Sequence, residues 1–216
     1  MLAWTVDRRF AKVLDLHSRG RETLWGYACP SSPVDSLWRA KAIQLSQASG
    51  YGSDERPPSA DGEHFQWQFA EHGAMSLLTE THDQFQPPYA SAVTEAAAVW
   101  GGVLWLLDEP LPLTGRVTDG CSGLPLAATL TVQSLGFTEG EVIRTSSNAG
   151  RFHGFLPSGN HSILVEAPGF LPATVSVQVP STGGATLDVQ LDPVGGGAVS
   201  FCPAIPNSLG QVPLHY

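Results

Sequence analysis

Seven short segments, separated by turns, limit what this chain can fold into. From residue 113 onward, strand patterns recur at intervals of about ten residues, with DG, EG, NAG, PSGN and TGG between them. Apolar and polar residues alternate along these segments, which is typical of half-buried strands and not of helices. The segments are LTGRVTD, ATLTVQS, EVIRTSS, GRFHGFLP, HSILVEAPG, ATVSVQVP and ATLDVQLD. The pattern therefore predicts a seven-stranded β-sandwich over residues 113–192.

Residues 1–109 follow a different, mixed pattern. Apolar residues at helical spacing predict helices over 34–48 and 91–109, and two apolar runs predict mostly buried strands over 11–18 and 72–80. The run AAAVWGGVLWLL within the second helix is about 12 residues long, too short to span a membrane, so we expect a buried helix with Trp100 and Trp105 in the core. We expect an α/β unit over residues 1–109, and a tail or linker over 193–216.

Charge and cysteine content exclude some classes of function. The net charge is −9 and the chain has two lysines, so neither nucleic acid nor an anionic membrane is an expected partner. Three scattered cysteines, Cys29, Cys121 and Cys202, are compatible with one disulfide and a spare thiol, or with none. The first ten residues lack the features of a signal peptide, so either the protein is cytoplasmic or its natural start lies upstream.

Three stretches resemble the zinc metallocarboxypeptidase family, specifically the branch with a transthyretin-like sandwich after the catalytic domain. AKVLDLHS (11–18) is similar to the strand that carries the third zinc ligand, a histidine followed by serine. SLLTETHDQFQPPY (76–89) resembles the strand that bears the catalytic glutamate. GRVTDGCSGLPLAATLTV (115–132) and GRFHGFLPSGNHSILVEAPGF (150–170) resemble the transthyretin-like, or carboxypeptidase regulatory-like, module.

The resemblance implies a site and an activity. By it, His17 is a zinc ligand and Glu80 is the general base that activates metal-bound water, in an enzyme that hydrolyses the C-terminal peptide bonds of peptides and proteins. It also implies a secreted or periplasmic protein. The fold implied is part of an α/β carboxypeptidase catalytic domain over 1–109, followed by a transthyretin-like β-sandwich over 113–192.

The chain departs from the family pattern where the rest of the zinc site should be. It has no H-x-x-E motif, which supplies the first two ligands in the family, and no counterpart of the upstream arginines that bind the substrate carboxylate. Tyr51 is the nearest match for the family's mobile tyrosine. We therefore expect the C-terminal part of a carboxypeptidase, inactive alone and completed by a missing N-terminal catalytic half. The alternative is a non-enzymatic remnant whose sandwich serves as an interaction or stability module.

The remaining acidic residues and histidines can be explained without a role in a metal site. Asp15 shares a side of its strand with His17 and is either a hydrogen-bond partner of that ligand or a solvated charge. His64, His72 and His82 have no histidine or acid at helical spacing that would make a local metal pair, and the last two are expected in loops. His153 and His161 are expected at the surface or edge of the sandwich. An acidic specificity pocket would have Glu63 and Glu71 available.

Overall fold

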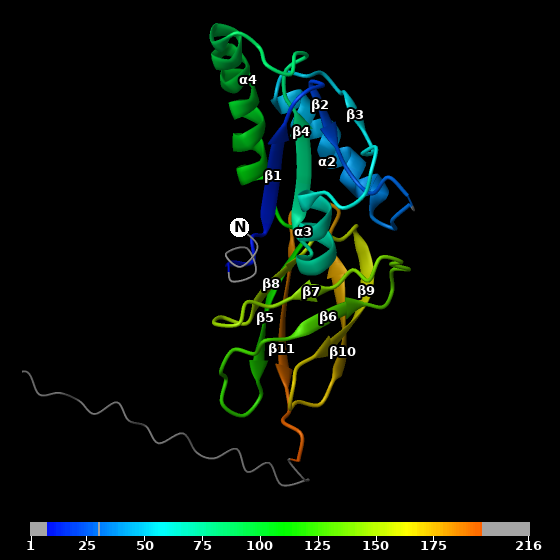
Figure 1. Ribbon diagram of the computed structural model, residues 1–216. Helices are drawn as coiled ribbons and strands as arrows, with labels where there is room; N and C mark the ends of the chain where they lie inside the picture. The colour runs from blue at the N-terminus through cyan, green and yellow to red at the C-terminus, as the bar shows by residue number, and fades with distance from the viewer. Residues whose placement is uncertain (1–7, 30, 196–216) are drawn as a thin grey trace, which may run out of the picture.

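The computed structural model describes residues 8–29 and 31–195, which form an α/β unit and a β-sandwich stacked end to end (Figure 1). The sheet of the α/β unit has four strands in the order β1-β4-β2-β3. They are β1 (Lys12–His17), β2 (Glu22–Leu24), β3 (Glu55–Arg56) and β4 (Met75–Glu80). β1 runs parallel to β4, β2 runs antiparallel to β4, and β3 runs parallel to β2.

Three helices cover this sheet: α2 (Asp35–Ala48), α3 (His64–His72) and α4 (Tyr89–Asp108). α2 and α4 pack against each other, whereas α3 packs on β4 and β1. The predicted helices over 34–48 and 91–109 are present, but α3 was missed, and His72 therefore lies in a helix and not in a loop. The Gln66 side chain accepts a hydrogen bond from the Glu63 backbone N–H at 2.9 Å and marks the start of α3, and Gly73 ends it at φ 68°.

β1 is less buried than the sequence predicts. It lies at one edge of the described sheet, and its residues are half-buried or exposed, with Leu16 53% exposed. β4, the central neighbour, is buried from Met75 to Thr79. The apolar pattern of β1 indicated a strand correctly, but a strand at an edge leaves apolar side chains partly uncovered.

The prediction of a buried helix at its apolar run is also wrong for α4. The helix is 20 residues long, and its buried residues are Glu95, Val99, Gly102 and Leu106. The opposite side is apolar and exposed; Trp100, predicted in the core, is 58% exposed, and Val93, Leu104 and Leu107 are exposed with it. Among the described residues, α4 is the one helix with the length and composition to cross a membrane, and 17% of that stretch is buried.

The sandwich has the seven strands that the sequence predicts. One sheet has the order β10-β9-β6-β7 and the other β11-β5-β8. The strands are β5 (Leu113–Asp119), β6 (Thr129–Val132), β7 (Ile143–Arg144), β8 (Arg151–Gly154), β9 (Gly159–Glu166), β10 (Ala173–Val179) and β11 (Ala185–Leu191). His153 and His161, expected at the surface, are both buried. Most of the predicted tail lies outside the described residues.

One phenylalanine of the sandwich half is buried in the core of the α/β unit. Phe155 follows β8 directly, yet it packs with Trp38 of α2 and Phe69 of α3, at ring-centroid distances of 6.3 and 6.4 Å. Its backbone N–H also donates to the Gly73 carbonyl at 3.0 Å. The two parts therefore share packing as well as backbone hydrogen bonds.

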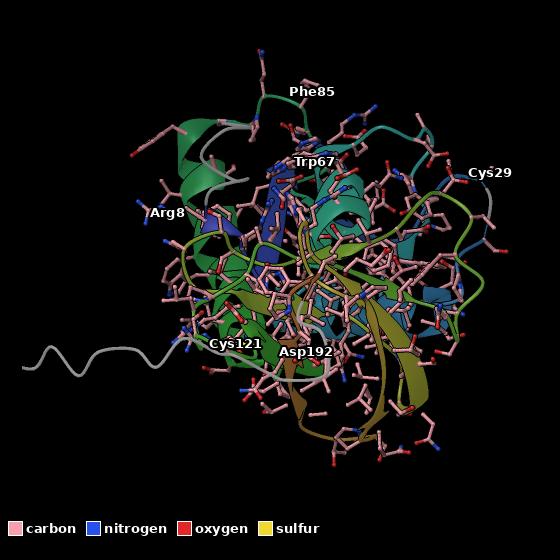
Figure 2. All side chains as sticks on the ribbon, turned by 90° about the horizontal axis from the view of Figure 1, so that it is seen from below. Arg8, Cys29, Trp67, Phe85, Cys121 and Asp192 are labelled. Carbon is pink, nitrogen blue, oxygen red and sulfur yellow. The ribbon has the colours of Figure 1, made fainter. Side chains whose placement is uncertain are left out.

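We predict that Phe155→Ala destabilises the whole chain. Truncating a fully buried phenylalanine costs about 3–5 kcal/mol, because the packing is lost and a cavity remains. Chemical denaturation followed by tryptophan fluorescence should show that loss. Phe85, which projects from the loop after β4 and is 69% exposed, is the matched control (Figure 2); Phe85→Ala should cost less than about 0.5 kcal/mol. Equal effects of the two substitutions would contradict the shared core.

Candidate functional site

The two residues to which the resemblance assigns roles lie side by side at the carboxyl ends of two neighbouring strands. His17 ends β1 and Glu80 ends β4, and the parallel register of the two strands pairs them directly. Residues paired directly in a sheet project from the same face, so both side chains point to the α3 side together with Asp15. The ends of parallel strands are a common place for a site in an α/β sheet.

The Glu80 carboxylate is set in an unusual environment for a surface acid. Its Oε2 is buried and has no hydrogen-bond partner among the described residues. Burial raises the pKa of the Glu80 carboxyl, and the electrostatic interaction with His17 opposes that rise. A carboxylate with a raised pKa and a free acceptor oxygen has the properties of a general base or acid.

The backbone approaches Glu80 closely at Gly20. A side chain at this position would place its Cβ 3.0 Å from the Glu80 Cβ and 2.7 Å from Glu22 Oε1. The Gly20 N–H donates to the His82 carbonyl at 2.7 Å, which holds the loop after β1 against the loop after β4. Only glycine fits here without displacing the two glutamates.

Asp15 is neither a hydrogen-bond partner of His17 nor a solvated charge, the two alternatives expected from the sequence. Its Oδ1 lies 3.0 Å from Nδ1 of His64, the first residue of α3, and the other His64 nitrogen bonds the Gln68 amide at 2.8 Å. Asp15 therefore connects β1 to α3 and is not a partner of His17 in this structure. His64 has both ring nitrogens engaged.

A buried carboxylate that was not singled out from the sequence connects the loops that follow β1, α2 and β4. Glu95 of α4 accepts two hydrogen bonds from the Arg21 guanidinium, at 3.1 and 2.8 Å, one from the Tyr51 hydroxyl at 2.7 Å and one from the His82 backbone N–H at 3.0 Å. Tyr51 is buried in this network and is not positioned as a mobile substrate contact. Glu95 is the one charge within an apolar helical run, which is the sequence signature that could have revealed it.

The described residues do not include a complete metal centre. No group of three or more His, Cys, Asp or Glu side chains within them is arranged to hold an ion. Cys29 is exposed with a free thiol. His17 and Glu80, the two residues to which the resemblance assigns roles, end neighbouring strands.

Comparison with known proteins identifies the sandwich. A sandwich of two small sheets, antiparallel except where β11 runs parallel to β5, defines the class of this domain, and residues 112–192 match the model of the carboxypeptidase regulatory-like domain family. This part of the chain is therefore a regulatory-like domain of that kind. The match includes none of residues 1–109, so it does not support the catalytic half that the resemblance implies. No curated protein matches the chain.

Similarity to solved structures is weak. A putative membrane-associated protein of unknown function from Bacteroides fragilis has 19% identity and a TM-score of 0.29, over 38% of this chain and 28% of that chain. A putative carbohydrate binding protein from Bacteroides uniformis has 15% identity and a TM-score of 0.29, over 38% of this chain and 40% of that chain. Klebsiella pneumoniae 5-hydroxyisourate hydrolase has 20% identity and a TM-score of 0.27, over 38% and 90%. The chain thus spans less than half of the first two structures.

We predict that Glu95 makes the stability of the protein depend on acid pH. Hydrogen bonds from Arg21 first, and also from Tyr51 and His82, lower the pKa of Glu95 from 4.5 to about 2. A carboxyl group with a lower pKa in the folded state adds stability above its unfolded pKa, and this contribution is lost as the pH falls from about 5 to 2. This contribution is at most about 3 kcal/mol, and it is reduced because solvent screens the charge of Arg21, whose side chain is 45% exposed.

The measurement is the free energy of unfolding at pH 7 and at pH 2.5. Glu95→Gln should be less stable than the wild type at pH 7, and the difference should shrink at pH 2.5. Glu166→Gln, at an exposed position at the end of β9, is the matched control and should leave the pH dependence unchanged. A Glu95→Gln variant with the wild-type pH profile would contradict the role given to the network.

Proposed function

We propose that this chain is the C-terminal part of a zinc metallocarboxypeptidase, fused to its regulatory-like sandwich. In this proposal His17 is one zinc ligand, Glu80 is the general base, and the substrates are the C-termini of peptides or proteins. The observation that supports it is the direct pairing of His17 with Glu80 at the ends of β1 and β4. The buried, unpartnered Glu80 oxygen supports the assignment of the base.

The residues present do not fit a complete zinc site. A catalytic zinc ion takes about three protein ligands, and His17 supplies one of them. The described residues offer no set of three. We therefore assign no catalytic step to this chain alone and propose that a second polypeptide, the upstream catalytic half, supplies the other ligands.

The open side of β1 is where we propose that the upstream half joins. The Ala11 and His17 carbonyls accept hydrogen bonds from the β4 side, at Met75 and Thr81, so the backbone groups of alternate residues Lys12, Leu14 and Leu16 face the open edge. An added strand would satisfy these groups.

An apolar groove continues from this edge onto α4. It encloses about 470 Å³ and includes Leu16, Phe85, Val99, Trp100 and Val103 among its lining residues. Apolar side chains beside a strand edge that no described strand pairs with favour a polypeptide occupant. A polypeptide can cover the apolar side chains and also form backbone hydrogen bonds with the strand edge. Figure 1 shows α4 on the β1 side of the sheet, away from β3.

The same surface also favours a second candidate function. A non-enzymatic interaction module would use the β1 edge and the exposed side of α4 to bind a partner protein without any catalysis. The two candidates differ in whether an H-x-x-E motif is encoded upstream of Met1, in frame or one frameshift away, and in whether the completed protein hydrolyses peptides.

We predict that the purified, dialysed chain contains much less than one equivalent of zinc. A single histidine with a neighbouring carboxylate lacks the ligand number for tight binding, which is typical of sites with three or four ligands. Metal analysis of the wild type and of His17→Ala measures this directly, and both should be nearly metal-free. A full equivalent that disappears in His17→Ala would show that the chain alone completes the site, contrary to the proposal of an upstream half.

We predict that adding the polypeptide encoded upstream restores carboxypeptidase activity, which a chelator then removes. In that complex Glu80→Gln should lower turnover by about 10²–10⁴ with zinc retained, because glutamine keeps the size of glutamate but cannot accept a proton. His17→Ala should lose both zinc and turnover. Glu166→Gln, far from the site on β9, is the matched control. Near-full activity of Glu80→Gln would refute the assignment of the base, and stable complex formation without activity in the wild type would favour the interaction module.

A further inference from the structure

A second cavity, of about 670 Å³, lies at the junction of the α/β unit and the sandwich. Its floor is formed by the three-stranded sheet, because residues 114–116 of β5, 151–153 of β8, and Thr186 and Asp188 of β11 line it. Residues 8, 9 and 11, just before β1, and the turn at 146–149 form its sides. Figure 2 shows Arg8 at the periphery of the molecule, on the side opposite Cys29.

The lining of this cavity is strongly basic in an acidic protein. Among the described residues, Arg8, Arg9, Arg116 and Arg151 line it, together with one carboxylate, Asp188. These are four of the 11 basic residues in a chain of net charge −9. Such a concentration of one sign in a concave site attracts ligands of the opposite sign.

Two of the arginines face each other across neighbouring strands. Arg116 of β5 and Arg151 of β8 are directly paired in the antiparallel register. Like charges in such a pair destabilise a sheet, unless an opposite charge lies between them. The Arg116 Nε donates to the Ala149 carbonyl at 2.9 Å, and within the described residues neither guanidinium forms an ion pair with a carboxylate.

A buried histidine adds an uncharged hydrogen-bonding group to the same wall. His153 also lines the cavity and is 7% exposed, and its Nε2 has no hydrogen-bond partner among the described residues. Burial, and next the charge of neighbouring His72, lower the pKa of His153 to about 4, so the ring is neutral near pH 7. A buried nitrogen without a partner is costly and points to a group that completes it.

We propose that this cavity binds a small ligand that carries a doubly charged oxyanion, of the class of a phosphate monoester. Guanidinium groups donate hydrogen bonds in a planar fork that matches phosphate oxygens. A tetrahedral dianion accepts such bonds from several directions at once, and Arg116 and Arg151 line the cavity from two neighbouring strands. A planar carboxylate is satisfied by one guanidinium fork. The site is separate from His17 and Glu80, and it does not depend on the carboxypeptidase proposal.

The probe is inorganic phosphate, titrated into the full chain by isothermal calorimetry at constant ionic strength in a chloride background. Phosphate should bind, and Arg116→Gln and Arg151→Gln should each weaken binding by about tenfold or more, since each removes charge-assisted hydrogen bonds. Arg39→Gln is the matched control: it removes the same charge from a surface arginine paired with Glu55, and affinity should not change.

The other outcomes overturn the proposal. Equal weakening by Arg39→Gln would show that only net charge matters, and no heat of binding to the wild type would show that the cavity takes no oxyanion. Tighter binding of malonate than of phosphate would assign a dicarboxylate instead. Vesicles containing phosphatidic acid test a lipid source of the same group; we expect no cosedimentation, because the net charge of −9 is repelled by an anionic surface. Cosedimentation that Arg116→Gln abolishes would replace the small ligand with a membrane.

Discussion

The aromatic cluster of Trp38, Phe69 and Phe155 holds the two parts of this protein together. Phe155 comes from the chain that leaves β8, and it fills the space between α2 and α3. The Trp38 indole N–H donates to the Ser76 carbonyl of β4, so the same cluster also fixes the central strand of the α/β sheet. A change of packing at the junction therefore reaches the strand that ends at Glu80.

This arrangement explains why an α/β unit with so few strands forms at all. A sheet of four strands, two of them three residues or shorter, buries little apolar area by itself. The sandwich contributes Phe155 to its core and partly buried Leu135 and Phe137 to the packing around it. Arg144 and Glu71 form an ion pair at the same junction. The regulatory-like domain is thus a structural support of the unit above it, whatever activity that unit has.

Two surfaces of the described part of the chain differ in kind. At β1 and α4 the surface is apolar and has an open strand edge, which suits a polypeptide. At the junction, the cavity gathers positive charge around Arg116 and Arg151, which suits a small anion. The Glu95 network holds the loops beside the first surface, whereas Arg9 contacts both His72 and the Thr145 carbonyl beside the second.

Local pattern determined the parts of this protein that depend on neighbouring residues. Alternation and turn residues specified all seven sandwich strands, and helical spacing specified α2 and α4, because both periodicities are set by backbone geometry. The pattern also delivered His17 and Glu80 to strand ends, although their roles came from the family resemblance. Burial was harder to predict: Leu16 and Trp100 look like core residues in sequence, but they are exposed because nothing in the described chain covers that edge. Contacts between distant residues could be decided only by tertiary structure. Asp15 contacts His64 and not His17, and Glu95 accepts hydrogen bonds from Arg21 and Tyr51. Arg116 and Arg151, 35 positions apart, form a cross-strand pair. Strand order and register bring these residues together, and both are set by packing of the whole chain and not by local sequence.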